Sequence, residues 1–136
     1  MIIKISPDKE KAKSLLKMAE SRANEIKELD IKKFSTIVAE NYYEIIKEMI
    51  TAILLTKGIK ATGEYAHKDL IEQALKHHFI EDFEHSLLND LRDRRNKSQY
   101  EGRQIELHYI ENNKEVLEKV MVKLRKALMQ ILEQEK

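Results

Sequence analysis

Glycine and proline are almost absent from this sequence, with three Gly and one Pro among 136 residues. Turns between short strands depend on these two residues, so the chain has too few of them to connect the strands of a large sheet. Aromatic residues are also few, at 6%, whereas Leu, Ile, Lys and Glu are abundant. This composition is typical of helices. We therefore predict an all-α protein, and the length fits a single domain over residues 1–136.

Apolar residues recur every three to four positions along most of the chain, which is the spacing of one buried helix face. A first helix is predicted to start with Ser6 as its N-cap and Pro7 in its first turn, and to end near Leu29. A second helix, capped by Asp30, is predicted to run to Gly58. Its apolar residues cover more than one face, so we expect it to be the central helix.

The rest of the chain is predicted to complete an up-and-down bundle of four to five helices. Gly63 indicates a loop before the third helix, and alternating apolar residues late in the chain indicate an extended segment. Asn112 and Glu115 have the spacing of a capping box that opens the last helix. The predicted segments are a loop at 58–65, helices at 66–77 and 80–98 with a break near His78, the extended segment at 101–110 and a helix from residue 112 onward.

The charges of the chain are balanced, with 25 Lys and Arg against 24 Asp and Glu and a formal charge of +1. Attraction of the whole molecule to nucleic acid or to an anionic membrane is not expected, so any such binding must be local. The absence of Cys excludes disulfides, thiolate metal sites and a Cys nucleophile. No stretch approaches the roughly 18 apolar residues of a membrane span, and the N-terminus lacks the apolar region of a signal peptide. We expect a soluble, cytoplasmic protein without membrane contact.

The most unusual stretch is 91–103, where five cations stand against two acidic residues. The cations are Arg92, Arg94, Arg95, Lys97 and Arg103. On a helical wheel Arg95 lies on the side of Leu88 and Leu91, which is the apolar side of the fourth helix. A guanidinium there has five fixed donors and suits a phosphate or a carboxylate. The alternative is a structural arginine that extends past the end of the bundle or pairs with Glu84 on the same line of the wheel.

Three groups of residues, in order along the chain, resemble the HEPN superfamily (higher eukaryotes and prokaryotes nucleotide-binding domains). Residues 39–46 and 52–58 resemble the family's central helix, and His67-Lys68-Asp69-Leu70 resembles the His-Lys at the start of its third helix. The sequence Arg95-Asn96-Lys97-Ser98-Gln99-Tyr100 resembles the R-x(4–6)-H motif near the end of the penultimate helix, with Tyr100 in place of His. One branch of small members carries Arg-x-Lys-x-x-Tyr at this place. The resemblance covers most of the chain.

This resemblance implies a homodimer that forms through the motif-bearing helices, with Arg95 and its mate in a shared cleft. Active relatives cleave RNA there without a metal, which implies Arg95 for phosphate contact, Asn96 for orientation and Tyr100 for a substrate or proton contact. It also implies the toxin or effector half of a two-component system with a small nucleotidyltransferase-type antitoxin, and no cofactor. Further contacts to RNA or nucleotide are expected from Arg92, Lys97, Arg103, His67 and Lys68.

Tyr100 leaves other functions open, because a phenol with an ordinary pKa of about 10 is a poor general base at neutral pH. The chain could be a non-catalytic HEPN module that binds a nucleotide or a nucleotidyltransferase partner, or a plain helical interaction adaptor. His67, which opens a helix after the Gly-containing loop, is the histidine best placed to act as a base instead. The spacing of His78, Asp82 and His85 would put them on one face of a continuous helix as metal ligands, but the predicted break falls among them.

Overall fold

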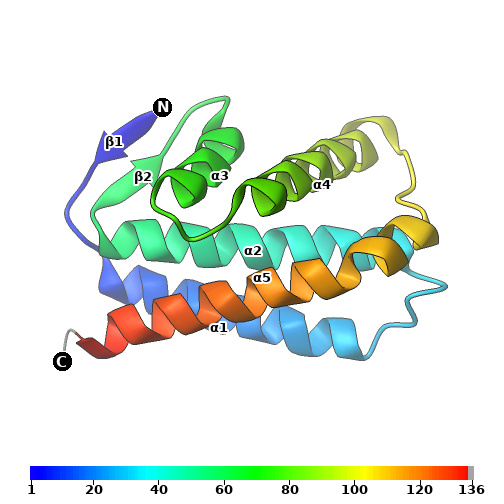
Figure 1. Ribbon diagram of the computed structural model, residues 1–136, viewed down its shortest axis with the longest axis horizontal. Helices are drawn as coiled ribbons and strands as arrows, with labels where there is room; N and C mark the ends of the chain where they lie inside the picture. Colours follow the sequence, from blue (N-terminus) through cyan, green and yellow to red (C-terminus); the bar gives the residue numbers. More distant parts are fainter. Residues whose placement is uncertain (135–136) are drawn as a thin grey trace.

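The computed structural model describes residues 1–134, which form five helices and one two-stranded sheet. The helices are α1 (Lys9–Lys27), α2 (Ser35–Thr56), α3 (Ala66–Lys76), α4 (Asp82–Glu101) and α5 (Leu107–Gln134), and the strands are β1 (Ile2–Lys4) and β2 (Ile59–Ala61). Figure 1 shows α2 in the middle, with α1 and α5 along one side and α3 and α4 along the other. The four long helices alternate in direction in chain order (Figure 1). The predicted all-α bundle is confirmed.

Helix α2 is central because most of its surface is apolar. Of its 22 residues, 15 are buried, which requires neighbours on more than one side. The longest helix, α5, contributes a single apolar seam at helical spacing. The fully buried side chains of that seam are Ile110, Leu117, Val120, Leu124 and Leu128, each 0% exposed. The predicted central position of α2 is confirmed (Figure 1).

The start of α1 differs from the prediction of a Ser6 N-cap. The helix begins at Lys9, and its N-cap is Asp8, whose Oδ1 accepts a hydrogen bond from the Lys11 N–H at 3.0 Å. The preceding residues are held in extended conformation, because β1 pairs antiparallel with β2 and the Asp8 N–H donates to the Leu55 carbonyl at 3.0 Å. The predicted loop at 58–65 therefore contains a strand, β2. Because β1 pairs with β2, which is almost 60 residues later in the chain, α1 begins after Asp8 instead of after Ser6.

Gly58 is the point where the end of α2 meets the chain leaving β1. Its φ is +72°, and a Cβ here would lie 2.6 Å from the Ile5 carbonyl oxygen. That backbone is itself tied to Gly58, because the Ile5 N–H donates to the Gly58 carbonyl at 2.9 Å. We expect Gly58→Ala to lower the free energy of unfolding by about 3 kcal/mol, as measured by urea denaturation.

The matched control is Gly63→Ala. Gly63 also has a positive φ, +88°, but a Cβ there meets nothing within 4 Å. This variant carries the left-handed backbone penalty without the collision, so it should cost about 1 kcal/mol. Equal losses for the two variants would show that the close approach of Ile5 to Gly58 contributes nothing.

The turn between α1 and α2 also differs from the prediction. Asp30 does not cap α2, since its Oδ1 accepts the Lys32 N–H at 3.0 Å and its carbonyl accepts the N–H groups of Lys33 and Phe34. Asp30 therefore closes a separate turn, and α2 begins at Ser35. Asp30 does accept backbone N–H groups as a capping residue would, but it does so in the turn that connects α1 and α2.

The boundaries of α3 and α4 agree closely with the predicted helices. The break falls at His78, which has a positive φ of 62°. Helix α4 then opens with a capping box between Glu81 and Glu84, and it ends at Gly102, whose φ of 68° is left-handed. It therefore extends to Glu101, three residues beyond the predicted end at Ser98.

The predicted extended segment at 101–110 holds for residues 102–106 and is wrong beyond them, because α5 already begins at Leu107. The connection before α5, residues 102–106, is non-helical, and Ile105 within it is buried in the core with 2% of its surface exposed. The Ile105 carbonyl accepts the Ser35 hydroxyl at 2.8 Å, and its N–H donates to the Thr36 Oγ1 at 2.9 Å. The predicted capping box at Asn112 therefore lies inside α5. An alternating pattern this short fits the start of a helix as well as a strand.

Candidate functional site

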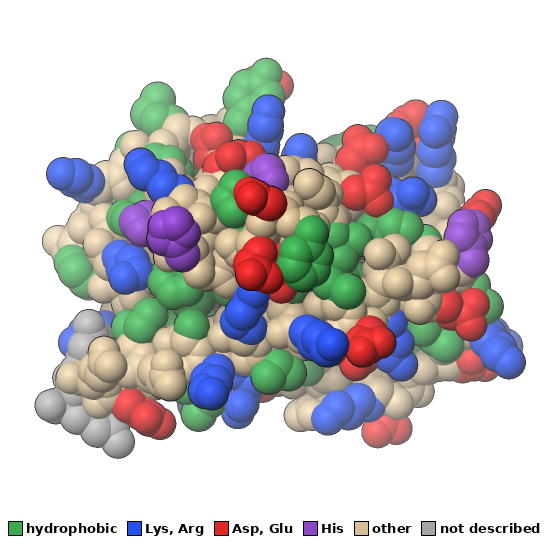
Figure 2. Space-filling model, viewed as in Figure 1, with side chains coloured by type: hydrophobic (Ala, Val, Ile, Leu, Met, Phe, Trp, Pro, Cys, Tyr) green, Lys and Arg blue, Asp and Glu red, His purple; other side chains and the backbone are tan. Residues whose placement is uncertain are grey.

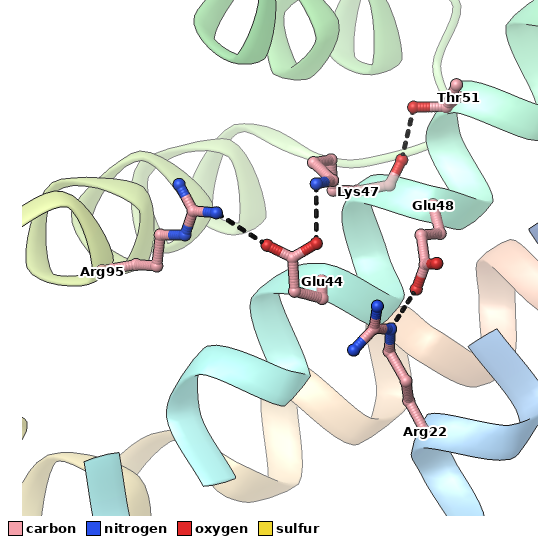
Figure 3. Close-up of polar contacts among 6 residues, drawn as sticks. All are labelled: Arg22, Glu44, Lys47, Glu48, Thr51 and Arg95. Carbon is pink, nitrogen blue, oxygen red and sulfur yellow. Dashed lines mark hydrogen bonds and ion pairs between the residues drawn. The ribbon is translucent and has the colours of Figure 1, made fainter. Parts of the chain in front are cut away.

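Arg95 projects from α4 onto the middle of α2. Its Nη2 donates to Glu44 Oε1 at 2.9 Å, and Glu44 Oε2 lies 2.6 Å from Lys47 Nζ (Figure 3). The side chains of Arg95 and Glu44 are only 12% and 19% exposed, so the ion pair is shielded from water. The predicted alternative partner, Glu84, is wrong, because it lies eleven residues away, about 16 Å along the helix axis. Glu84 instead accepts from Lys123 on α5.

Tyr43 connects this ion pair to α3. The Arg95 Cζ lies 5.3 Å from the centroid of the Tyr43 ring, and the His67 ring centroid lies 6.1 Å from it, with the ring planes at 55°. Tyr43 is 3% exposed. Its hydroxyl is buried and has no hydrogen-bond partner within residues 1–134. Three helices therefore meet at one aromatic ring.

Most cations of the 91–103 stretch are neutralised by near neighbours. The pairs are Arg94 with Asp90 at 2.9 Å, Lys97 with Asp93 at 3.0 Å and Arg103 with Glu101 at 3.7 Å. Figure 2 shows the same mixture, with basic and acidic side chains interspersed over the visible face. The stretch is therefore much less basic in space than it is in sequence.

Arg92 differs from these cations. It makes no ion pair within the described part of the chain, and its buried Nε donates to no acceptor there. Its positive charge acts on both Tyr43 and His67. We call Tyr43, Glu44, Lys47, His67, Arg92 and Arg95 the Arg95 cluster.

Burial and positive neighbours set the protonation of His67. Burial lowers the pKa of His67, and the charges of Lys47, Arg95 and Arg92 lower it further, against an opposing effect of Glu44. The imidazole is therefore neutral at pH 7 and offers a lone pair that can accept a proton.

Two further groups of the cluster, Tyr43 and Glu44, have shifted pKa values that keep the first protonated and the second ionised. Burial raises the pKa of Tyr43 to about 12, although Arg95 and Arg92 act against this shift. The phenol therefore keeps its proton and can donate it in a hydrogen bond. Burial alone would raise the pKa of Glu44, but the hydrogen bond and charge of Lys47, with the charge of Arg95, hold it below its usual value. Glu44 is therefore a carboxylate.

Removing the charge of Arg95 should raise the pKa of His67. We expect the NMR titration midpoint of the His67 imidazole to move upward in Arg95→Met, because one of the cations that disfavour imidazolium is gone. Arg125→Met is the control, since Arg125 on α5 pairs with Glu20 on α1 at 2.8 Å, and Figure 1 shows α1 and α5 on the other side of α2 from α3. An unchanged midpoint in Arg95→Met would show that the two groups are not coupled.

The sequence-predicted site residues fall into two groups in one protomer. Arg92, Arg95 and His67 lie together in the Arg95 cluster. Tyr100 is 81% exposed and lies five residues after Arg95, about 140° around the helix. The structure therefore does not bring Tyr100 to the Arg95 guanidinium within one chain. Among the remaining predicted residues, Asn96 and Lys97 are partly exposed, and Lys68 and Arg103 are exposed.

Sequence reasoning missed three functional candidates on α2, namely Tyr43, Glu44 and Lys47. A usable signal was present, because Glu44 and Lys47 are charged residues three positions apart in a helix that is otherwise mostly buried. A charged pair on such a helix needs a partner or a function. The wheel of α4 alone could not show that Arg95 is that partner.

Two further findings concern metal ions and membranes. His85 Nε2 lies 2.6 Å from Glu72 Oε1, and His78 lies in the turn before α4. Within residues 1–134, no group of three or more His, Cys, Asp or Glu side chains is arranged to hold a metal ion. None of the helices over the same residues has the length and apolar content needed to cross a membrane.

Comparisons of the chain with models of protein families, with curated proteins and with solved structures give no match. The fold and the site define an all-α bundle whose penultimate helix carries a shielded arginine, with a neutral histidine of another helix near the same tyrosine ring.

Proposed function

We propose that this chain is a HEPN-like effector that binds and cleaves RNA without a metal, as a homodimer. The observation that supports it most is the Arg95 cluster, which combines two arginines of the penultimate helix with His67 of α3. We also propose a small nucleotidyltransferase-type antitoxin as its partner in a cytoplasmic two-component system. These last features rest on the resemblance of residues 39–58, 67–70 and 95–100 to the HEPN superfamily.

The cluster has the groups that metal-independent RNA cleavage requires. RNA carries its own nucleophile, so a site needs positioning, charge neutralisation and proton transfer. In the proposed reaction the 2′-oxygen attacks the adjacent phosphorus, the bond to the 5′-oxygen breaks and a 2′,3′-cyclic phosphate forms. His67 accepts the proton of the 2′-hydroxyl, and the resulting imidazolium returns a proton to the leaving 5′-oxygen.

The two arginines supply the positive charge. Glu44 occupies one donor of Arg95 and fixes the direction of its guanidinium, while the other donors remain for phosphate oxygens. Arg92 has no carboxylate partner within residues 1–134, so its charge is not already neutralised. A fixed arginine and an unpaired one can therefore share the charge that develops on the phosphate.

Tyr100 and its neighbours fit a contact surface better than the centre of the reaction. The exposed phenol can stack on an RNA base or meet the partner protomer across α4. Asn96, next to Arg95, is assigned to orientation, and Lys68, Lys97 and Arg103 to contacts along the RNA backbone. In this assignment His67 takes the part that the motif histidine plays in active HEPN relatives.

The Arg95–Glu44 ion pair also favours a second candidate. A shielded arginine that is already paired with a carboxylate is also the arrangement expected of a purely structural contact between α4 and α2. The chain would then be a non-catalytic HEPN module that binds a nucleotide or a nucleotidyltransferase, or a helical interaction adaptor.

A cleavage assay separates these functions. The protein is incubated with a mixed tRNA pool in EDTA, and fragments are read on a gel for wild type, Arg95→Ala and His67→Ala. We expect each substitution to lower the cleavage rate by about 100-fold or more. Arg94→Ala is the control, because Arg94 is the neighbouring residue but pairs with Asp90 and lies over the Tyr109 ring of α5, 4.1 Å from its centroid, and its rate should stay within about twofold.

The other outcomes are equally distinct. Folding of each variant is checked by its circular dichroism melt, and light scattering reports whether the protein is a dimer. RNA retained in a gel shift without cleavage would support the non-catalytic module. Neither binding nor cleavage by the wild type, together with an Arg95→Ala variant that melts early, would support the adaptor.

A further inference from the structure

His67 also lines a cavity of ≈ 180 Å³ where α1, α2, β2 and α3 meet. Three lysines line it, each from a different element: Lys11 on α1, Lys47 on α2 and Lys60 on β2. His67 on α3 adds a neutral imidazole. No Asp or Glu is among its lining residues. The chain as a whole has 25 basic and 24 acidic residues, so the charge of the cavity lining differs from the average of the chain.

Two of these lysines are available to a ligand. Lys11 and Lys60 are exposed, and neither makes an ion pair within residues 1–134. The third, Lys47, already pairs with Glu44, since its Nζ lies 2.6 Å from Glu44 Oε2. Their ammonium groups are strongly hydrated point charges with three donors each, which suits a small anion with several oxygens.

The backbone adds to the same potential. The first turn of α3 lies at the cavity through Ala66 and His67, and α3 has no side-chain cap. The N–H groups of His67 and Lys68 donate to no backbone acceptor in the described part of the chain. The N-terminal end of a helix carries partial positive charge, so it favours an anion here as the lysines do.

The floor of the cavity is apolar. Leu54, Leu55 and Leu70 line it. Apolar walls exclude water, and charge interactions are stronger where water is excluded. A cavity with cations at its rim and an apolar floor therefore fits a compact ligand that carries a concentrated negative charge.

We propose that this cavity binds the phosphate group of a small ligand. A tetrahedral phosphate presents oxygens in several directions, which matches lysines arriving from three elements, whereas a single carboxylate would match one or two of them. Inorganic phosphate and a nucleoside monophosphate share this chemistry. The cavity shares Lys47 and His67 with the Arg95 cluster, but Arg92 and Arg95 are not among its lining residues, so phosphate binding here does not require RNA cleavage.

Calorimetric titration of the full chain tests the proposal. The protein is titrated at constant ionic strength with inorganic phosphate, with adenosine 5′-monophosphate and with adenosine. We expect saturable one-to-one binding of a phosphate-bearing probe and none of adenosine. Tighter binding of the monophosphate assigns the site to an organic phosphate, and tighter or equal binding of inorganic phosphate assigns it to the free anion; both support a phosphate site.

Matched double variants locate the binding. Lys11→Gln with Lys60→Gln removes two charges at the cavity, and we expect the Kd to rise by about tenfold or more. Lys17→Gln with Lys126→Gln removes two exposed charges from α1 and α5 outside the cavity, and its Kd should change by less than about twofold. Arg95→Ala should keep phosphate binding even where it loses RNA cleavage.

Three results would overturn the proposal. They are no saturable binding of either phosphate probe by the wild type, binding of adenosine as tight as that of its monophosphate, and an equal loss of affinity in the two double variants.

Discussion

Leu124→Ala is expected to lower the free energy of unfolding by about 3 to 4 kcal/mol. Leu124 is 0% exposed and lies in the middle of the α5 seam, between Val120 and Leu128, which are also 0% exposed. Helix α5 packs against the central helix α2, so the cavity left by the missing methyl groups would open inside the core. Both the lost burial and the residual cavity contribute to the loss. Urea denaturation at pH 7 measures it.

Val122→Ala is the control on the same helix. Val122 is 68% exposed, two residues from Leu124 but on the opposite side of α5. Its truncation removes little buried surface and should change the free energy of unfolding by less than about 0.5 kcal/mol. A loss at Leu124 as small as the loss at Val122 would mean that α5 is not packed on α2 as the structure shows.

Glu44→Ala is expected to lower the free energy of unfolding by about 2 kcal/mol at pH 7. It leaves Arg95 and Lys47 without their shared carboxylate, although their side chains are only 12% and 23% exposed. The control is Glu115→Ala, which breaks an ion pair with Lys119 whose side chains are 84% and 74% exposed. An exposed pair of this kind contributes less than about 0.5 kcal/mol.

The contribution of Glu44 should also depend on pH. Its pKa is lower in the folded protein than in the unfolded chain, so its stabilising effect is complete above the ordinary Glu pKa. The effect is lost as the pH falls through the lowered pKa. The difference between wild type and Glu44→Gln in urea denaturation should therefore shrink on acidification. A difference that stays constant or grows toward low pH would show that Glu44 stabilises by packing rather than by charge.

The Arg95–Glu44 contact also bears on the proposed chemistry. A guanidinium that is held by a carboxylate needs no rearrangement when a phosphate arrives, and this preorganisation is what favours stabilisation of a developing charge. Glu44→Gln separates the charge of Glu44 from its position, because the variant retains the shape of the side chain and one acceptor oxygen but removes the charge.

Patterns within single segments determined most of the secondary structure. Helix α2 carries apolar residues on several faces, and such a helix can be stable only in the centre of a bundle. The wheel of α4 likewise placed Arg95 on its apolar side, and the structure finds that side chain shielded. These properties follow from the sequence because helical period relates each residue to a face of its own helix.

Tertiary contacts decided the rest. The start of α1 moved to Lys9 because β1 pairs with β2, and no residue near Ser6 encodes that partner. The carboxylate at Arg95 is Glu44, which is 51 residues away in the chain, rather than Glu84 on the same helix. The pKa of His67 is set by charges on α2 and α4. Periodicity states which face of a helix is buried, but the identity of the covering element, and every charge that it carries, depends on distances that only the assembled bundle defines.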